Sequence, residues 1–404
     1  MPMPMRCSLD DFTLVRPINR GAHSLVHLAL HRASQRYFAL KVLSKERLAC
    51  AGTAAANEVL REKRALLALQ GHPFLTALHS TFHDATRLVL VLELALGGDL
   101  RGVLIRRQRR RRGPHDRMRG ALEEEHTRFY AAALVLALGH LHAHGYVYRD
   151  LKPENVLLDA RGFPVLCDLG AAVHLGPAGR AMTLVGTWEY AAPEVLEGRG
   201  CTLAADWWSL GVVLLEALCG EPPFSSGDSD DPVLALEAAL RFGADCPLLV
   251  ELSPAARTLV SDALLLVDEA RRWGACRDGA PCAHAFFAPV DWAALAARTA
   301  PPPHEPTLLG NADTRNFFHA SLDEPDAARV GVGLAGSSPV PTAAGGSEAA
   351  AWASDEDDDH DARGCQVAAG AAVEDAANGA AARAKARARK RVRSKEVYEW
   401  WEGF

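Results

Sequence analysis

The sequence lacks any apolar run long enough to cross a membrane. The longest runs, such as LGVVLLEALCG (210–220), fall short of the roughly 18 to 20 residues that a transmembrane helix needs. The first residues, MPMPMRCSLD, also lack the apolar core of a secretory signal. We therefore expect a protein that is neither inserted into a membrane nor sent across one.

Paired cysteine spacing is missing as well. The nine cysteines are scattered, which in a chain without a targeting signal indicates reduced thiols in the cytoplasm, with the nucleus as the alternative. The segment CRDGAPCAH offers Cys276, Cys282 and His284 as metal ligands, but a zinc site needs a fourth ligand. We therefore interpret this segment as a surface loop.

A strong net charge is absent too, since 44 basic residues nearly balance 50 acidic ones and leave −6 at pH 7. Charge is nevertheless unevenly distributed: residues 106–120 and 382–395 are rich in arginine, and residues 354–361 are acidic. Neither basic segment contains interleaved aromatic residues, and together they account for nothing in the fold. Nucleic acid is therefore an unlikely partner on this pattern, and solvated segments explain the charge more simply.

What the chain does have is apolar residues, 49% of the total, which suffice to bury a large core. Short apolar runs alternate with turns from residue 12 to about 96, around one helical segment at 55–70. From Glu123 to about residue 287 the apolar positions recur at helical spacing. The expected fold class is α+β: a small antiparallel β lobe with one main helix, and a large, mainly α-helical lobe.

The two ends of the chain differ in composition from these lobes. Residues 1–11 form an N-terminal extension, and residues 288–404 form a tail that starts with prolines. Between about 325 and 395 the tail is rich in alanine, glycine, serine and charged residues, a composition that predicts disorder. The final segment, VYEWWEGF, breaks this pattern with its aromatic residues.

Two motifs in the first lobe provide a cation and its partner. Phosphoryl transfer needs positioning and charge neutralisation: a cation on the phosphates, ligands for magnesium, and a carboxylate beside the attacking hydroxyl. Lys41 in FALKVL lies on a predicted strand, and Glu62 lies on the helix that follows this strand. Lys41 would hold the α- and β-phosphates, and Glu62 would pair with Lys41 and fix its position, although a lysine and a glutamate taken alone are an ordinary surface pair.

The remaining groups follow in the second lobe. In YRDLKPEN, Asp150 is the candidate base, Lys152 would neutralise the transferring phosphoryl group, and Asn155 would bind magnesium. Asp168 of CDLG would bind the bridging magnesium. An isolated Asp-Leu-Gly is an ordinary turn, but its position shortly after YRDLKPEN favours the functional interpretation.

These motifs resemble those of an AGC-group serine/threonine protein kinase, closest to the cyclic-nucleotide-dependent kinases. The resemblance covers about residues 12–320, including GTWEYAAPEVL (186–196) and the tail segment DTRNFF, and extends to the last four residues. It implies an ion pair between Glu194 and Arg272, and a tie between Asp206 and the backbone of the catalytic loop. The implied enzyme transfers the γ-phosphoryl group of ATP to serine or threonine, with ATP and Mg²⁺ as cofactors.

The resemblance also implies a domain organisation. A two-lobed protein kinase domain would span residues 12–287, with a small lobe at about 12–96 and a large lobe at about 97–287. The arginine-rich insert at 106–120 would lie within the large lobe, and residues 288–404 would be an AGC-type tail.

A nucleotide pocket is implied between the lobes. Apolar side chains would hold the adenine against hinge backbone, a lid would cover the phosphates, and a tail phenylalanine would close over the base. The implied residues are Ile18, Asn19, Arg20, Gly21, Ala22, His23, Ser24, Leu25, Val26, Ala39, Lys41, Leu92, Glu93, Ala95, Leu157 and Phe317.

The lid is poor in glycine. Where relatives have three glycines that let backbone amides approach the phosphates, this chain has Asn19, Gly21 and Ser24. Asparagine is the non-glycine residue that best tolerates positive φ, and serine is small. This predicts weaker nucleotide binding. A pseudokinase scaffold that binds nucleotide with little turnover is the alternative.

Three acids match positions at which relatives bind substrate arginines: Asp99, Glu154 and Glu237. Carboxylates pair well with guanidinium groups, although a single acid is more often a solvated surface charge. The implied substrates are proteins with arginine upstream of the target serine or threonine. A regulatory protein subunit is a further candidate partner.

Two regulatory features are also implied. Thr183 matches the activation-loop phosphosite and Arg149 its phosphate ligand, but the usual additional basic positions hold Val173 and Glu58. Phosphorylation is therefore expected to stabilise the active state less than in relatives. The end of the chain, WEGF (401–404), resembles a hydrophobic motif in which Trp401 and Phe404 dock on the small lobe; the alternative is a terminus that is merely apolar.

Overall fold

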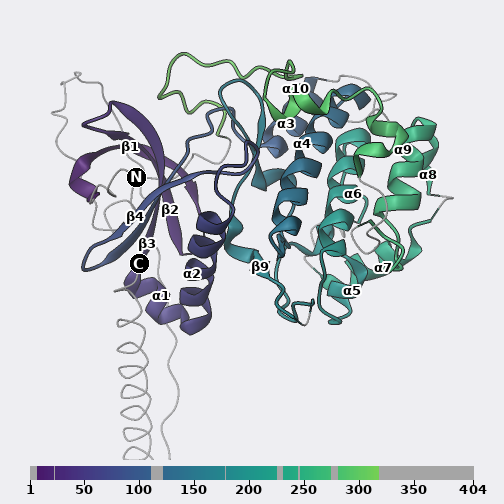
Figure 1. Ribbon diagram of the computed structural model, residues 1–404, viewed down its shortest axis with the longest axis horizontal. Helices are drawn as coiled ribbons and strands as arrows, with labels where there is room; N and C mark the ends of the chain where they lie inside the picture. The colour runs from purple at the N-terminus through teal and green to yellow at the C-terminus, as the bar shows by residue number, and fades with distance from the viewer. Residues whose placement is uncertain are drawn as a thin grey trace, which may run out of the picture. The chain divides into compact units, whose positions relative to one another are not determined.

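The computed structural model describes two lobes within residues 7 to 317 (Figure 1). The described ranges are 7–21, 23–110, 122–177, 179–224, 231–243, 246–273 and 281–317. Several predictions fall outside them: those on Ala22, on most of the arginine-rich insert, on Cys276, and on the tail beyond Phe317 with Trp401 and Phe404. No helix within the described ranges combines the length and apolar character that a membrane span requires.

The small lobe is built on one antiparallel sheet with strand order β1-β2-β3-β5-β4. Its strands are β1 (Phe12–Arg20), β2 (Ser24–His31), β3 (Arg36–Ser44), β4 (Leu78–His83) and β5 (Arg87–Leu92). Between β3 and β4 in the sheet, β5 has four consecutive apolar residues that are at most 2% exposed, as expected of a strand covered on both faces.

Two helices follow β3, α1 (Lys45–Ala51) and α2 (Thr53–Ala68). The sequence predicted a single helix at 55–70, which corresponds to α2. The additional short helix α1 begins where the Ser44 hydroxyl accepts a hydrogen bond from the Arg47 amide, at 3.3 Å. Serine favours such N-terminal caps, and this local signal was not used in the prediction.

The large lobe is mainly helical. Its helices are α3 (Leu100–Arg110), α4 (Glu124–Ala143), α5 (Pro193–Leu196), α6 (Ala204–Cys219), α7 (Pro232–Arg241), α8 (Pro247–Val250), α9 (Pro254–Leu259) and α10 (Trp292–Ala296). Short strands form two further pairs, β6 (Tyr146–Val147) with β9 (Val173–His174) and β7 (Val156–Leu158) with β8 (Pro164–Leu166). The expected α+β fold class with a small β lobe and a large helical lobe is therefore confirmed.

Single helical turns complete the structure. They are η1 (Leu9–Asp11), η3 (Pro153–Asn155), η4 (Leu169–Ala171), η5 (Trp188–Tyr190), η6 (Val260–Leu264), η7 (Pro281–Ala283) and η8 (Ala285–Phe287). Of these, η6 is a π-helical turn and the others are 3₁₀ turns. The turns η3, η4 and η5 matter most for function, because they carry or border the candidate catalytic residues.

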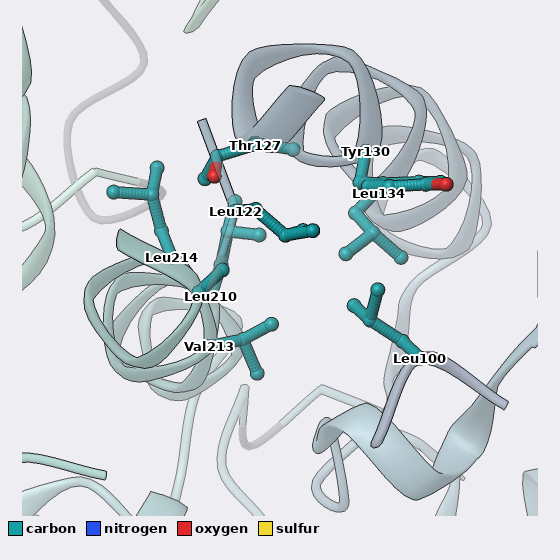
Figure 2. A pocket seen from close by; sticks show the side chains of 10 residues that line it. Leu100, Leu122, Thr127, Tyr130, Leu134, Leu210, Val213 and Leu214 are labelled. Carbon is teal, nitrogen blue, oxygen red and sulfur yellow. The ribbon is translucent and has the colours of Figure 1, made fainter. Parts of the chain in front are cut away.

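Helix α6 is the centre of the large lobe. It is apolar around nearly its whole circumference, and such a helix is stable only when it is enclosed by protein. Its neighbours approach closely: a Cβ added to Gly211 would lie 2.8 Å from Cδ2 of Leu265. Leu210, Val213 and Leu214 of α6 also line a small apolar pocket that α3 and α4 close, and the side chain of Leu100 points into it (Figure 2).

A buried ion pair connects α5 to the segment after η6. Glu194 and Arg272 are both fully buried, and two hydrogen bonds of 2.7 and 3.0 Å join the guanidinium to the carboxylate. Arg272 also donates to the carbonyl oxygens of Leu266 and Ala204. The structure thus contains the pair that the family resemblance implied, with the remaining donors of the arginine satisfied.

Replacing Glu194 with alanine should lower the free energy of unfolding by about 3 to 5 kcal/mol, because the buried guanidinium of Arg272 loses its partner. The matched control is Glu197→Ala, which removes an exposed pair with Arg199 and should cost at most about 1 kcal/mol. Urea unfolding measures both values. A similar loss in the two variants would contradict this account of the buried pair.

Candidate active site

One buried carboxylate holds the backbone of the catalytic loop. Asp206, in the first turn of α6, is 0% exposed. Its oxygens accept hydrogen bonds of 2.8 Å from the amides of Tyr148 and Arg149, and it lies 2.8 Å from Nε2 of His142. Arg149 has a φ of +72°, which is uncommon for a residue with a side chain. These contacts stabilise that conformation and place the next residue, Asp150.

The candidate base Asp150 lies among three polar partners. The side-chain amide of Asn155 donates to the carbonyl and to Oδ2 of Asp150, each at 2.8 Å. Nζ of Lys152 is 3.0 Å from Oδ2 of Asp150. The hydroxyl of Thr187 donates to Oδ1 of Asp150 at 3.1 Å and accepts from Lys152 at 2.8 Å. These contacts fix the orientation of both charged groups.

Thr187 is a residue that the sequence analysis did not identify. Its only signal in the sequence is its place in GTWEYAAPEVL, at the end of the activation segment. The contact with Asp150 spans 37 residues of chain, so spacing alone does not reveal it.

Lys41 joins the two lobes electrostatically. Its Nζ lies 2.7 and 2.9 Å from the carboxylate oxygens of Glu62 on α2 and 3.2 Å from Oδ1 of Asp168. Burial alone would lower the pKa of Lys41, but the carboxylates of Glu62 and Asp168 outweigh burial and raise it. The charge of Lys41 in turn lowers the pKa of Asp168. Lys41 and Asp168 therefore stay ionised at neutral pH, whereas burial raises the pKa of Glu62 and the adjacent charge of Lys41 opposes that shift.

Two oxygen-bearing side chains converge where magnesium would bind. Asp168 has a left-handed backbone, with a φ of +51°. The amide of the preceding Cys167 donates to the carbonyl of Asn155 at 2.9 Å, so Asn155 and Asp168 are held near each other. Asn155 uses its amide nitrogen on Asp150, which leaves its amide oxygen for a cation. Carboxylate and amide oxygens suit magnesium, which commonly binds one or two protein groups plus phosphate oxygens.

No larger metal cluster competes with this pair. Within the ranges that the structure describes, no three His, Cys, Asp or Glu side chains gather into a metal site. Cys282 and His284 are described and belong to no such group, whereas Cys276 lies outside the described ranges.

A cleft of about 1030 Å³, partly open to solvent, contains most of the predicted nucleotide residues. Those that line it are Ile18, Asn19, Gly21, Ser24, Val26, Ala39, Lys41, Leu92, Glu93, Ala95, Leu157 and Phe317. Arg20, His23 and Leu25 are not among the lining residues. Leu25 is instead buried within the small lobe, 6% exposed, because alternate residues of β2 face opposite sides of the sheet. Thr76 and Leu94 also line the cleft and were not predicted.

The lid differs from the expectation in one respect. Strands β1 and β2 pair as far as Arg20 and Leu25, and the Gly21 amide donates to the Ser24 carbonyl at 3.0 Å. Asn19 and Ser24 are thus extended, so the tolerance of asparagine for positive φ is not used in this conformation. An added Cβ at Gly21 would lie 2.6 Å from the Ser24 hydroxyl oxygen, and a change of the Ser24 rotamer relieves this contact.

The tail segment reaches the same cleft. Phe317 packs against a buried cluster that includes Ile18 and Ala39. The side-chain amide of Asn316 donates to the Leu96 carbonyl at 3.2 Å. Gly98, with a φ of +80°, permits this close approach, since a Cβ there would lie 2.3 Å from the Asn316 carbonyl oxygen. Phe317 is therefore placed where the family resemblance implied.

The candidate phosphosite contains more positive charge than the sequence suggested. Nη1 of Arg149 donates to the exposed Thr183 hydroxyl at 3.1 Å. Nη2 of Arg149 and Nε of Arg61 are buried, and neither atom has a hydrogen-bond partner among the described residues. Burial lowers the pKa of Arg149, and the nearby guanidinium of Arg61 adds to this effect, while Cys201 opposes it. The sequence analysis missed Arg61 because it considered only the two usual basic positions, which hold Val173 and Glu58.

The three acids expected to bind substrate arginines lie in different environments. Oδ1 of Asp99 accepts from the Gly102 amide at 2.7 Å and so caps α3, and Asp99 and Glu154 both line the cleft. Glu154 is already paired with Arg101 at 2.8 Å. Glu237 is not a lining residue; it pairs with Arg241 one turn later on α7, at 2.9 Å.

This arrangement of a paired lysine, a fixed aspartate and a candidate magnesium-binding pair at an interlobe cleft is typical of a phosphoryl-transfer site of the protein kinase class. The family described as protein kinase domain matches residues 12–286, and the chain belongs to it. The predicted protein kinase is thereby confirmed. A protein kinase domain in general uses ATP and Mg²⁺ and acts on proteins.

Individual relatives refine this assignment. Serine/threonine-protein kinase Sgk1 of Fundulus heteroclitus is 37% identical over 328 residues, which cover 80% of this chain and 70% of the relative. The cAMP-dependent protein kinase catalytic subunit PRKX of Homo sapiens is 35% identical over 318 residues, covering 78% and 82%. Atypical protein kinase C of Drosophila melanogaster is 36% identical over 324 residues, covering 77% and 50%. These similarities confirm the predicted AGC-type serine/threonine kinase.

Replacing Thr187 with alanine should reduce kcat by roughly 10- to 100-fold, because Asp150 and Lys152 lose the hydroxyl that orients them. Affinity for ATP should change little, since Thr187 does not line the nucleotide cleft. Thr187→Ser keeps the hydroxyl and is the matched control. The orienting role would be wrong if alanine and serine variants turned over equally fast.

The Cys167 thiol should react slowly with iodoacetamide at pH 8. Burial raises its pKa, and the adjacent carboxylate of Asp168 raises it further, so the reactive thiolate is scarce. Alkylation should be at least about tenfold slower than at the exposed Cys50. Mass spectrometry of the folded protein compares the two sites, and similar rates would contradict the predicted protonation of Cys167.

Proposed function

We propose that this protein is an ATP-dependent serine/threonine protein kinase whose substrates carry arginine upstream of the phosphorylated residue. The observation that carries the proposal is the three-way contact of Lys41 with Glu62 and Asp168, beside a fixed Asp150. These contacts support the proposal because phosphoryl transfer needs a cation for the phosphates, an acid for magnesium and a carboxylate beside the attacking hydroxyl.

The residues divide the chemistry among them. Asp150 would accept the proton of the substrate hydroxyl, while Lys152 would neutralise charge on the transferring phosphoryl group. Lys41, held by Glu62, would contact the α- and β-phosphates of ATP. Magnesium, when bound, supplies further neutralisation of phosphate charge. Asn155 and Asp168 would provide its protein ligands, and their mutual placement orients the phosphates.

The cleft is suited to the adenine of ATP. Its apolar lining comes from both lobes and from Phe317 of the tail, while the backbone of Glu93 and Ala95 would present hydrogen-bonding groups to the base. The small lid residues Asn19, Gly21 and Ser24 leave room for phosphates, and weaker ATP binding than in glycine-rich relatives is expected.

Substrates and compartment follow from charge and cysteine chemistry. Asp99, the N-cap residue of α3, lines the cleft, and carboxylates pair well with guanidinium groups, which supports it as a contact for substrate arginine. A regulatory protein subunit remains a candidate partner.

The cysteines within the described ranges are free thiols. Reduced thiols support a location in the cytoplasm, with the nucleus as the alternative.

A catalytically weak pseudokinase scaffold is the competing function. Such proteins typically lack a lysine or a metal-binding acid. Here Lys41 contacts both Glu62 and Asp168, and the candidate base Asp150 is also present. The similarity to proteins named as serine/threonine kinases likewise does not support a scaffold.

The test is transfer of labelled phosphate from ATP with Mg²⁺ to an Arg-Arg-x-Ser peptide. Asp168→Asn and Lys41→Met should each lower transfer by at least about 100-fold, because charge stabilisation of the transition state is lost. Glu251→Gln, a neutralised acid on the surface, should be unchanged. No transfer by wild-type protein that binds ATP and carries phosphate on Thr183 would overturn the proposal.

A further inference from the structure

Arg101, the second residue of α3, makes three side-chain contacts at once. Its Nε donates to Glu154 at 2.8 Å, its Nη2 donates to the Tyr190 hydroxyl at 2.6 Å, and its Nη1 pairs with Glu216. The Tyr190 hydroxyl in turn donates to the second oxygen of Glu216 at 2.8 Å. Two carboxylates and a phenol therefore form a complete receptor for one guanidinium group, which we call the guanidinium receptor (Glu154, Tyr190 and Glu216).

The deepest member of the receptor cannot be explained as a solvated surface charge. The Glu216 side chain, in the last turn of α6, is 1% exposed, and Tyr190 is 3% exposed. Burial raises the pKa of Glu216, and the adjacent guanidinium of Arg101 opposes that shift. A buried carboxylate of this kind needs a cationic partner, and Arg101 is the one it has in this structure.

The receptor borders the catalytic residues. Glu154 lies in η3, next to Asn155 and two residues after Lys152, and it lines the nucleotide cleft. Tyr190 ends η5, three residues after Thr187, whose hydroxyl contacts Asp150. A peptide that presents a serine or threonine to Asp150 must therefore pass beside this receptor.

Arg101 is held in place from both sides. The preceding Leu100 is 1% exposed and points into the apolar pocket between α4 and α6 (Figure 2). The carboxylate of Asp99 caps the helix by accepting from the Gly102 amide. The first turn of α3 is thus fixed, and the Arg101 side chain is delivered to the receptor by the fold.

We propose that Arg101 is an internal ligand that fills an arginine site formed by Glu154, Tyr190 and Glu216, and so closes this site to arginine side chains of the substrate. The inference rests on the proposed kinase function and changes its expected specificity. Any preference for substrate arginine would depend on acids outside the receptor, such as Asp99, and Glu154 would be a positioning partner of Arg101.

Competition favours the internal arginine. A tethered group has an effective concentration on the order of millimolar, far above that of most protein substrates. A substrate arginine would gain the same hydrogen bonds but would leave the largely buried Arg101 guanidinium without its carboxylates. Replacement of Arg101, in contrast, would leave an open and doubly acidic receptor.

The main experiment compares wild type with Arg101→Leu on peptides that carry one arginine at each of five positions upstream of the serine, against a glutamine parent. At one position Arg101→Leu should gain at least tenfold in kcat/KM, mainly through KM, where wild type discriminates less than threefold. Adding Glu216→Gln to Arg101→Leu should abolish the gain. Identical position preferences in wild type and Arg101→Leu would overturn the proposal.

A second comparison leaves the buried part of the receptor intact. Glu154→Gln should change kcat/KM for the arginine peptides and for the glutamine parent by the same factor, because Glu154 contacts Arg101 and not the substrate. If Glu154 binds substrate arginine, the ratio between the two peptides falls at least fivefold in this variant, and the internal-ligand proposal is wrong.

A binding measurement separates this proposal from the kinase assignment, because it needs no catalysis. Methylguanidinium at about 20 mM should raise the Tm of Arg101→Ala by at least 2 °C, since bound ligand stabilises the folded state. Wild type, whose receptor is filled, and the double variant with Glu216→Gln should not respond, and methylammonium should have no effect. Equal responses of all three proteins would sink the receptor, whereas absent peptide transfer with a specific response would sink only the kinase function.

Discussion

The buried carboxylate of Asp206 is the constraint on which the active site depends. It holds the amides of Tyr148 and Arg149 and thereby fixes where Asp150 points. The same helix, α6, carries two more buried polar groups: Ser209 donates to the Tyr190 carbonyl at 2.8 Å, and Glu216 binds Arg101 and the Tyr190 hydroxyl. One apolar helix with three polar positions thus organises the catalytic loop, the end of the activation segment and the start of α3.

The small lobe is joined to this platform by charge. Lys41 contacts Glu62 within its own lobe and Asp168 of the large lobe, so one cation connects the sheet, α2 and the proposed magnesium ligand. The arrangement is that of an assembled phosphoryl-transfer site, even though only one of the three usual lid glycines is present. In this structure the lid consists of extended, paired backbone, closed by the hydrogen bond from the Gly21 amide to the Ser24 carbonyl.

Arginines of the chain itself take up acidic and hydroxyl partners near the site. Arg101 occupies the receptor beside the catalytic loop, and Arg149 contacts the Thr183 hydroxyl with Arg61 nearby. The first contact is the basis of our proposal that substrate arginine is excluded from the receptor. At the second, buried guanidinium nitrogens of Arg149 and Arg61 would meet a phosphate on Thr183. We therefore infer that internal guanidinium groups affect both substrate choice and activation.

The sequence by itself determined the two-lobed fold class and the order of Lys41, Glu62, Asp150 and Asp168, because short motifs carry backbone geometry and chemistry together. Only the tertiary structure decided the partners of Thr187, Arg61 and Arg101. Arg101 meets partners that lie 53, 89 and 115 residues further along the chain, at spacings that no local periodicity encodes. Such contacts depend on how α3, η3, η5 and α6 pack, and packing is a property of the whole core rather than of any segment.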